Sequence, residues 1–340
     1  METRKLYYED PFQKGFATTV VSCDAVKGGY TVVLAETAFY PEGGGQPYDT
    51  GVLGEANVLE VHEKNGVITH LCDKPLEVGK SVSGKIDWAR RFDHMQQHSG
   101  EHICSGLICE RFHCDNVGFH MGADVVTIDF NADISWDELM EIEQLANLYI
   151  YEDHPIDIQF YRGAELDKVE YRSKKPLEGD VRIVSFPGAD CCACCGTHVV
   201  RSGQVGLVKF LSVQKFRDGV RIELLSGKRA HRYLSECWAQ DVRIAQALSV
   251  KPNASFAGVE RVLAELSALK QRCAKLEESV FAQTAAQYEG KGDVLLFEDE
   301  MSGDSLRKLC DAVTNHCGGR CAVFAGADGA YKYALSLIHI

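Results

Sequence analysis

Two short motifs, a hundred residues apart, carry the side chains that bind transition metals. His94-Met-Gln-Gln-His98 has two imidazoles four residues apart, and Cys194-Cys-Gly-Thr-His198 has a thiolate and an imidazole at the same spacing. Residues i and i+4 share one face of a helix, so we expect His94 and His98 to face one ion. Three imidazoles and one thiolate are an ordinary tetrahedral ligand set for Zn²⁺. The sequence therefore predicts zinc held by His94, His98, Cys194 and His198.

Spacing alone leaves other ligand combinations open. His98 and His102 repeat the four-residue spacing one turn further along. Cys191, Cys192 and Cys195 surround the second motif and offer further thiols. Both motifs therefore predict a metal site whose register is not fixed by spacing.

A third motif is a glycine-rich loop, Tyr40-Pro-Glu-Gly-Gly-Gly-Gln46-Pro. Three consecutive glycines cannot pack a core and cost backbone entropy. Such a loop usually serves the close approach of another group. The alternative is a flexible hairpin, but the Tyr-Pro entry favours a shaped loop with Gln46 as its polar tip.

The elements that must position these motifs indicate an α+β protein with four regions. Residues 1–87 contain short β-rich runs separated by glycine turns, which predict a small β-barrel. Residues 88–235 mix helices and strands and begin with the helix that carries His94 and His98. A second helix is expected after Ser135, because Ser135 followed three residues later by Glu138 is a capping signal. This second region would be the metal-binding domain.

The last two regions are helical and then β-α-β. In residues 236–290, apolar positions recur at alternating spacings of three and four, which predicts a coiled coil, as a homodimer or an intramolecular hairpin, or a helix packed on its own domain. We call these positions the 259–280 seam; they are Val259, Val262, Leu266, Leu269, Cys273, Leu276 and Val280. Residues 291–340 read strand, helix, strand, and we expect that C-terminal domain to be incomplete.

Composition narrows the function classes. The net charge of −13 argues against a generic nucleic-acid binder. Local basic clusters remain, and the candidates for phosphate contact are Arg172, Lys174, Lys175, Arg217 and Arg221. Fourteen cysteines without a secretory leader indicate a reducing compartment. No apolar run approaches the ~18 residues of a membrane span, so we expect a cytoplasmic protein.

The three motifs, in this order, resemble the alanyl-tRNA editing proteins of the AlaX type, which are similar to the editing domain of alanyl-tRNA synthetase. The long form is closest, because a coiled segment and a β-α-β region follow. One departure is Cys195, which stands where the family usually has the first glycine of Cys-Gly-Gly-Thr-His.

The resemblance implies a trans-editing hydrolase with a zinc cofactor. Its substrate would be mischarged tRNA(Ala), carrying serine or glycine. It also implies that basic side chains bind the phosphates of the tRNA, and that these contacts position the tRNA without reading its sequence. Gln46 would contact the substrate or the RNA end, and Glu101 is a candidate base near the metal.

Two other function classes fit the same ligands. One is a zinc-dependent peptidase or amidase, although His98-Ser-Gly-Glu-His102 does not have the HExxH order. The other is a non-enzymatic zinc- or redox-sensing module, in which Cys191, Cys192, Cys194 and Cys195 would be the ligands or the switch.

Overall fold

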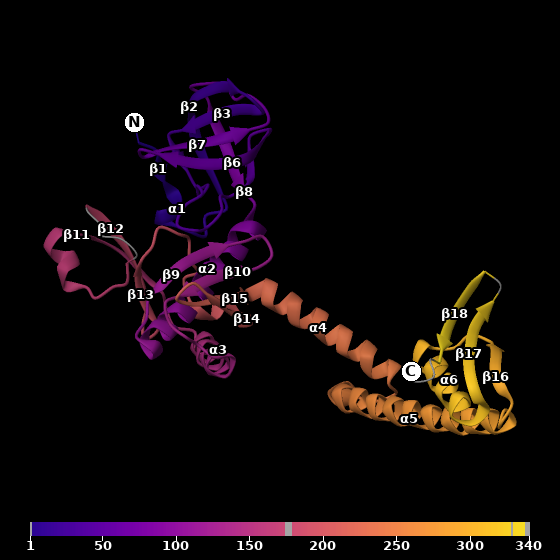
Figure 1. Cartoon of the computed structure of the whole chain (residues 1–340). Helices are drawn as coiled ribbons and strands as arrows, with labels where there is room; N and C mark the ends of the chain where they lie inside the picture. Colours follow the sequence, from indigo (N-terminus) through magenta and orange to yellow (C-terminus); the bar gives the residue numbers. More distant parts are fainter. Residues whose placement is uncertain (1, 174–178, 328, 337–340) are drawn as a thin grey trace. The chain divides into compact units, whose positions relative to one another are not determined.

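The N-terminal strands close into a barrel, and its last strand, β8 (Ser81–Ile86), leads into helix α2 (Trp88–Phe112) (Figure 1). This computed structural model describes residues 2–173, 179–327 and 329–336. The chain divides into two compact units, Met1–Cys237 and Trp238–Ile340. The expected α+β class with an N-terminal barrel is confirmed.

The barrel is antiparallel, with strand order β2-β3-β7-β6-β5-β8. Side chains along β2 alternate between exposed and buried, as a half-buried strand requires. The barrel core includes Val32, Leu53, Val61 and Ile68. The strands are β2 (Gly15–Val26), β3 (Gly29–Leu34), β5 (Gly51–Leu53), β6 (Ala56–Lys64), β7 (Val67–Cys72) and β8 (Ser81–Ile86), with β1 (Arg4–Lys5) and β4 (Glu36–Thr37) paired outside and α1 (Leu6–Glu9) following β1.

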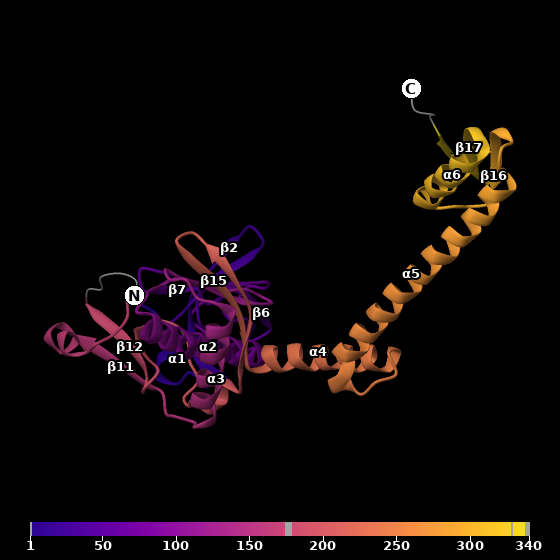
Figure 2. The same ribbon diagram turned by 60° about the horizontal axis from the view of Figure 1, so that its bottom comes forward.

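In the rest of this unit, two antiparallel sheets pack around α2 (Trp88–Phe112). One sheet has the order β14-β15-β10-β9 and the other β11-β12-β13. Figure 2 shows the long β14–β15 hairpin from the side. The elements are β9 (Asn116–Met121), β10 (Val126–Phe130), α3 (Trp136–Tyr151), β11 (Asp157–Arg162), β12 (Asp180–Phe186), β13 (Asp190–Ala193), β14 (Val208–Phe216) and β15 (Gly219–Ser226), with 3₁₀ turns at Gly163–Lys168 and Ser202–Val205.

Local signals account for the helix ends. The Asp87 carboxylate accepts the backbone N–H of Arg90 at 3.2 Å and caps α2, which ends at His113 in the left-handed conformation. Ser135 and Glu138 form the expected capping box at the start of α3. Ile103, Ile108 and Met95 of α2 pack with the sheet in a core separate from that of the barrel.

The unit Trp238–Ile340 is built on one long helix, α5 (Ser255–Gln287). Figure 2 shows α6 and its sheet at the C-terminal end of α5, where Phe281 and Ala285 enter their core. Strand β16 pairs in parallel with β17, and β18 pairs antiparallel with β17. The other elements are α4 (Gly227–Ala247), which begins in the first unit, a 3₁₀ turn at Pro252–Ala254, β16 (Gly292–Glu298), α6 (Gly303–Cys317), β17 (Gly318–Ala327) and β18 (Ala330–Leu335).

The 259–280 seam lies on α5. Its apolar side chains are exposed in the single chain, with Leu266 45% and Leu269 56% exposed. Within the described residues, no helix is both long enough and apolar enough to cross a membrane.

Candidate metal centre

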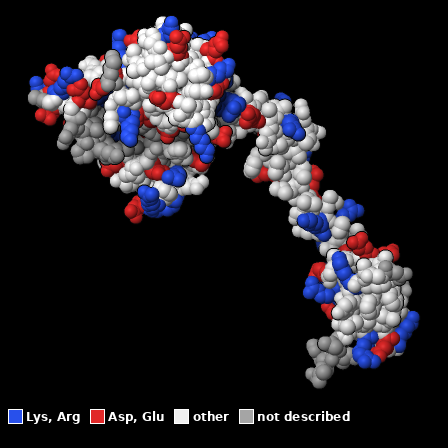
Figure 3. All heavy atoms as spheres, turned by 90° about the horizontal axis from the view of Figure 1, so that it is seen from above, with Lys and Arg blue, Asp and Glu red and all other residues white. Residues whose placement is uncertain are grey.

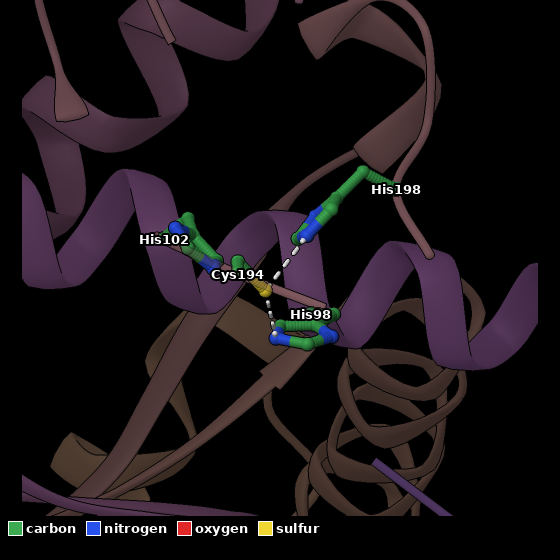
Figure 4. Close-up of side chains that lie close together, drawn as sticks. All are labelled: His98, His102, Cys194 and His198. Atoms are coloured by element: carbon green, nitrogen blue, oxygen red, sulfur yellow. Dashed lines mark hydrogen bonds between the residues drawn. The ribbon is translucent and has the colours of Figure 1, made fainter. Parts of the chain in front are cut away.

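Four side chains converge between α2 and the loop that follows β13. His98 and His102, one turn apart on α2, face Cys194 and His198 of the loop (Figure 4). Their ligand atoms all lie within 4.8 Å of one another. We call these four residues the His–Cys cluster. Its members come from segments almost a hundred residues apart, so the cluster joins the helix to the loop.

The distances within the cluster fit zinc. Cys194 Sγ lies 3.5 Å from His98 Nε2 and 3.3 Å from His198 Nε2. Zn–N bonds of ~2.0 Å and Zn–S bonds of ~2.3 Å at tetrahedral angles place N and S about 3.5 Å apart. The nitrogen and sulfur atoms are therefore spaced like the corners of a zinc tetrahedron.

Each imidazole is oriented through its other nitrogen. His98 Nδ1 donates to Gln46 Oε1 at 2.8 Å, and His102 Nδ1 donates to Asp190 Oδ2 at 2.8 Å. His198 Nδ1 lies 3.2 Å from Ser99 Oγ. A proton on Nδ1 leaves the Nε2 lone pair free, which is how metal-binding histidines are held. The polar partners thus prepare all three rings for a metal.

Electrostatics favour the metal-binding forms of Cys194 and His198. Burial alone would raise the pKa of Cys194, but His98, His198 and His102 reverse this and hold that pKa well below its usual range. Burial lowers the pKa of His198 to about 3, so its ring is neutral. Thiolate and neutral imidazole are the forms that bind zinc. For His102, burial lowers the pKa, but Asp190 and Cys194 reverse this and hold that pKa well above its usual value.

Three glycines, in two loops, make the cluster possible. A Cβ on Gly196 would lie 2.1 Å from His98 Cε1, so no larger residue fits beside that ring. Gly44 and Gly45 have φ of 58° and 82° and turn the chain between Gly43 and Gln46. The tight turn delivers the Gln46 side chain to His98.

A pocket of about 430 Å³ opens beside the cluster. It is lined by His98, His102 and Cys194 and also by Glu101, Asn116 and Arg182. Glu101 Oε1 accepts hydrogen bonds from Ser105 Oγ at 2.6 Å and Asn116 Nδ2 at 2.8 Å. We call this cavity the cluster pocket.

The relatives of similar sequence include alanyl-tRNA editing proteins. AlaX-L, an alanyl-tRNA editing protein of Pyrococcus horikoshii, is 31% identical over 318 residues, which cover 88% of this chain and 75% of the relative. Aarsd1-A, an alanyl-tRNA editing protein of Xenopus laevis, is 30% identical over 84% of this chain and 73% of its own length. This chain belongs to the alanyl-tRNA editing family.

Family descriptions and longer relatives agree with this placement. Residues 12–90 match the family described as tRNA synthetases class II (A), and residues 181–223 match the threonyl and alanyl tRNA synthetase second additional domain. An alanine–tRNA ligase of Pyrococcus abyssi is 35% identical over 98% of this chain. The chain spans only 38% of that ligase.

The structure of this editing-family chain corrects the register of the first histidine pair. His98 joins Cys194 and His198 as expected, but the fourth member is His102 and not His94. His94 lies one turn before His98, in a different pocket beside Arg90 and Arg229. Spacing could not separate the two pairs, because both share the helix face that meets the loop.

Gln46 differs from its expected role. Its side chain is fully buried, and Nε2 donates to Thr197 Oγ1 at 2.9 Å while Oε1 accepts from His98 and from Thr197 N–H at 3.1 Å. All these bonds stay within the protein. The side chain therefore orients His98 rather than reaching a substrate. Glu101, by contrast, lines the cluster pocket, with Oε2 4.0 Å from His102 Nε2.

The expected phosphate contacts are placed differently. Arg172 lines the cluster pocket but forms a bidentate ion pair with Asp190, at 2.7 and 2.8 Å. Arg221 pairs with Asp129 at 2.7 and 2.8 Å and covers the Phe216 ring, and Arg217 lies beside the same ring. Neither Arg217 nor Arg221 lines the cluster pocket. Lys174 and Lys175 lie outside the described residues.

Sequence reasoning missed the polar residues behind the ligands. Asp190 orients His102, Ser99 orients His198 and Thr197 orients Gln46. Thr197 lies within the second motif, but nothing in the local sequence marks Asp190 or Ser99. A second group, His102 with Asp190 and Cys192, also has metal-ligand spacing. Its Asp190 is already paired with Arg172, so the His–Cys cluster is the better candidate. In the described parts of the chain, neither Cys191 nor Cys195 joins a metal-type group.

Proposed function

We propose that this chain is a trans-editing hydrolase that cleaves the ester between a wrong amino acid and tRNA(Ala). Serine and glycine are the proposed errors. The observation that carries the proposal is the His–Cys cluster in the wall of the cluster pocket, in a chain of the alanyl-tRNA editing family. In an apolar pocket, the binding free energies of such similar amino acids differ by only ~1–3 kcal/mol. Binding alone therefore selects weakly between them, and a second, hydrolytic site is needed to remove the errors.

The residues of the cluster fit Zn²⁺, with His98, His102, Cys194 and His198 as proposed ligands. Zinc bound there supplies a fixed positive charge in the pocket wall and ties α2 to the 194–198 loop. A zinc ion held by these four side chains would act through its charge, and polar groups of the chain would carry the proton transfers at the ester.

Glu101 is the proposed proton acceptor. Its Oε1 is held by Ser105 and Asn116, and its Oε2 lies toward His102. In hydrolysis, a water oxygen attacks the ester carbonyl carbon and loses a proton to Glu101. The bond from that carbon to the ribose oxygen then breaks, and the ribose hydroxyl leaves with the proton. The ester is already activated, so no side-chain nucleophile is required.

Asn116 supports a preference for serine. Its Oδ1 is buried and has no hydrogen-bond partner among the described residues, and the side chain lines the cluster pocket. A serine hydroxyl can donate to this oxygen, whereas alanine would leave it unpaired. Sites that bond a substrate hydroxyl reject analogues without it most strongly.

The test is deacylation of Ser-tRNA(Ala), Gly-tRNA(Ala) and Ala-tRNA(Ala) by the purified full chain. We expect rapid loss of the serine or glycine ester, a spared alanine ester and no activity in Cys194→Ala. Lys27→Gln, an exposed change in the β2–β3 turn, is the matched control. Folded, zinc-loaded protein that cleaves none of these esters would refute the proposal.

A further inference from the structure

A second pocket, also of about 430 Å³, lies on the other side of the glycine loop. Its chemistry is basic, and we call it the basic pocket; its charged and polar lining is Arg90, Asp93, His94, Lys228, Arg229 and Arg232. Gly44 lines the cluster pocket and Pro47 lines the basic pocket, so a single short loop separates the two. Both pockets belong to the first unit.

Positive charge dominates this pocket. Four cationic side chains line it with one carboxylate, Asp93. Arg229 pairs with Asp93 at 2.7 Å and donates to the Gly122 carbonyl at 2.8 Å, so it is held in place. Arg90 donates to the Tyr48 carbonyl at 2.9 Å. Cations therefore remain in excess.

Lys228 and Arg232 provide the accessible part of that charge. They lie four residues apart, on one face of α4, and both are exposed. Within the described residues Lys228 forms no ion pair, and Arg232 has only a long contact of 3.9 Å with Glu236. In Figure 3 basic and acidic side chains are interspersed over the visible face, and the whole chain carries a charge of −13. A pocket with uncompensated cations is thus a local exception.

His94 adds a second observation that points to a ligand. Its side chain is 3% exposed and lines the basic pocket. Its Nδ1 is buried without a hydrogen-bond partner in the described parts of the chain. A buried polar atom without a partner is costly. His94 thus places a side chain with an unsatisfied polar atom in the wall of the basic pocket.

We propose that the basic pocket binds a backbone phosphate near the 3′ end of the RNA whose terminal ester enters the cluster pocket. This assignment rests on the proposed function. His94 lines the basic pocket and His98 lines the cluster pocket, four residues apart or about 6 Å along α2. One RNA strand can therefore reach both pockets. Every nucleotide carries a phosphate, and basic side chains that hold phosphates position the chain without reading its sequence.

The first experiment measures RNA binding without hydrolysis. An unacylated RNA hairpin with the tRNA(Ala) acceptor stem and its single-stranded 3′ end is titrated with the full chain at several salt concentrations. We expect Lys228→Gln combined with Arg232→Gln to weaken binding roughly tenfold, and to reduce the salt slope by about 1 per removed contact. Lys27→Gln should bind like the unmodified chain. Equal binding by the double variant and this control would overturn the proposal.

A second experiment separates phosphate contact from damage to the cluster pocket. Seryl-adenosine has the ester but no phosphate. We expect the kcat/KM of the double variant to fall roughly tenfold more on the seryl RNA hairpin than on seryl-adenosine, through KM. Equal losses on both esters would show a structural effect and overturn the proposal.

Two further outcomes distinguish this inference from the proposed function. RNA binding that depends on Lys228 and Arg232, without any ester hydrolysis, would support the phosphate site and refute the editing activity. Calorimetry with inorganic phosphate alone should show no tight binding. Tight phosphate binding that the double variant abolishes would identify a site for free anions and overturn the RNA assignment.

Discussion

At the scale of single residues, the helix histidines of the cluster differ from His94 in the partner of Nδ1. His98 and His102 have Nδ1 held by Gln46 and Asp190, whereas Nδ1 of His94 has no partner among the described residues. A ring held through Nδ1 directs its other nitrogen at a metal.

This difference predicts the metal content of two variants. His102→Asn should lose most of its bound zinc, because one of four ligands is removed. His94→Asn should retain about one zinc per chain, since His94 lies in the basic pocket. Metal analysis of dialysed protein measures both. The opposite pattern, with zinc lost only from His94→Asn, would restore the register expected from the sequence.

The close approach at Gly196 predicts a second metal-dependent effect. In Gly196→Ala the new Cβ would meet the His98 ring, so the ring must shift from its ligand position. We expect zinc affinity to fall about 10–100-fold, the usual effect of disturbing the contacts that orient a ligand. Competition with a zinc chelator gives the affinity. Gly303→Ala, which meets nothing within 4 Å, is the matched control and should keep the affinity of the unmodified chain.

At the scale of elements, the barrel contains a buried histidine that responds to pH. His70 on β7 is fully buried and lies 2.9 Å from Thr37 Oγ1 and 3.2 Å from the Val32 carbonyl. Burial lowers its pKa from 6.5 to about 4. The unfolded chain therefore takes up a proton at pH values where the folded barrel does not. Its contribution to stability is complete above pH 6.5 and is lost as the pH falls from 6.5 toward 4.

We expect the unfolding free energy to fall by about 2 kcal/mol when the pH is lowered from 6.5 to about 4.5. Urea unfolding can follow Trp88, which packs against the barrel core, in a chain with Trp136→Phe and Trp238→Phe. In His70→Gln, the unfolding free energy should depend less on pH than in His62→Gln, an exposed change on β6. Equal slopes for the two variants would show that His70 is not the responsible group.

At the scale of the whole molecule, the 259–280 seam sets the expected oligomeric state. Its leucines and valines are exposed on α5, although the end of the same helix is buried against α6. Apolar side chains at alternating spacings of three and four are buried when a second helix packs against them. We therefore expect the chain to form a homodimer through this seam.

Light scattering after size-exclusion chromatography tests this expectation. The unmodified chain should have twice the mass of one chain, and Leu266→Glu combined with Leu269→Glu should halve it, because charges would enter the interface. Gln271→Glu, an exposed polar position on α5, should remain dimeric. A single-chain mass for the unmodified protein would contradict the prediction.

The sequence by itself determined what depends on neighbours along the chain. The capping residues of α3, the helix that carries the histidines and the turn at Gly44–Gly45 follow from local propensity and backbone sterics. The short β-rich runs of residues 1–87 likewise predicted the barrel. The order of the three motifs was enough to indicate the family.

Only the tertiary structure decided which groups meet. Gln46 and Thr197 are 151 positions apart, and their hydrogen bond moves Gln46 from an expected substrate contact to a position behind His98. The Asp190 carboxylate binds both Arg172 and His102, so an arginine expected at phosphates is instead held at the cluster. The choice of His102 over His94 has the same origin. Helical spacing is identical for both pairs, and only the packing of the 194–198 loop against one turn of α2 distinguishes them.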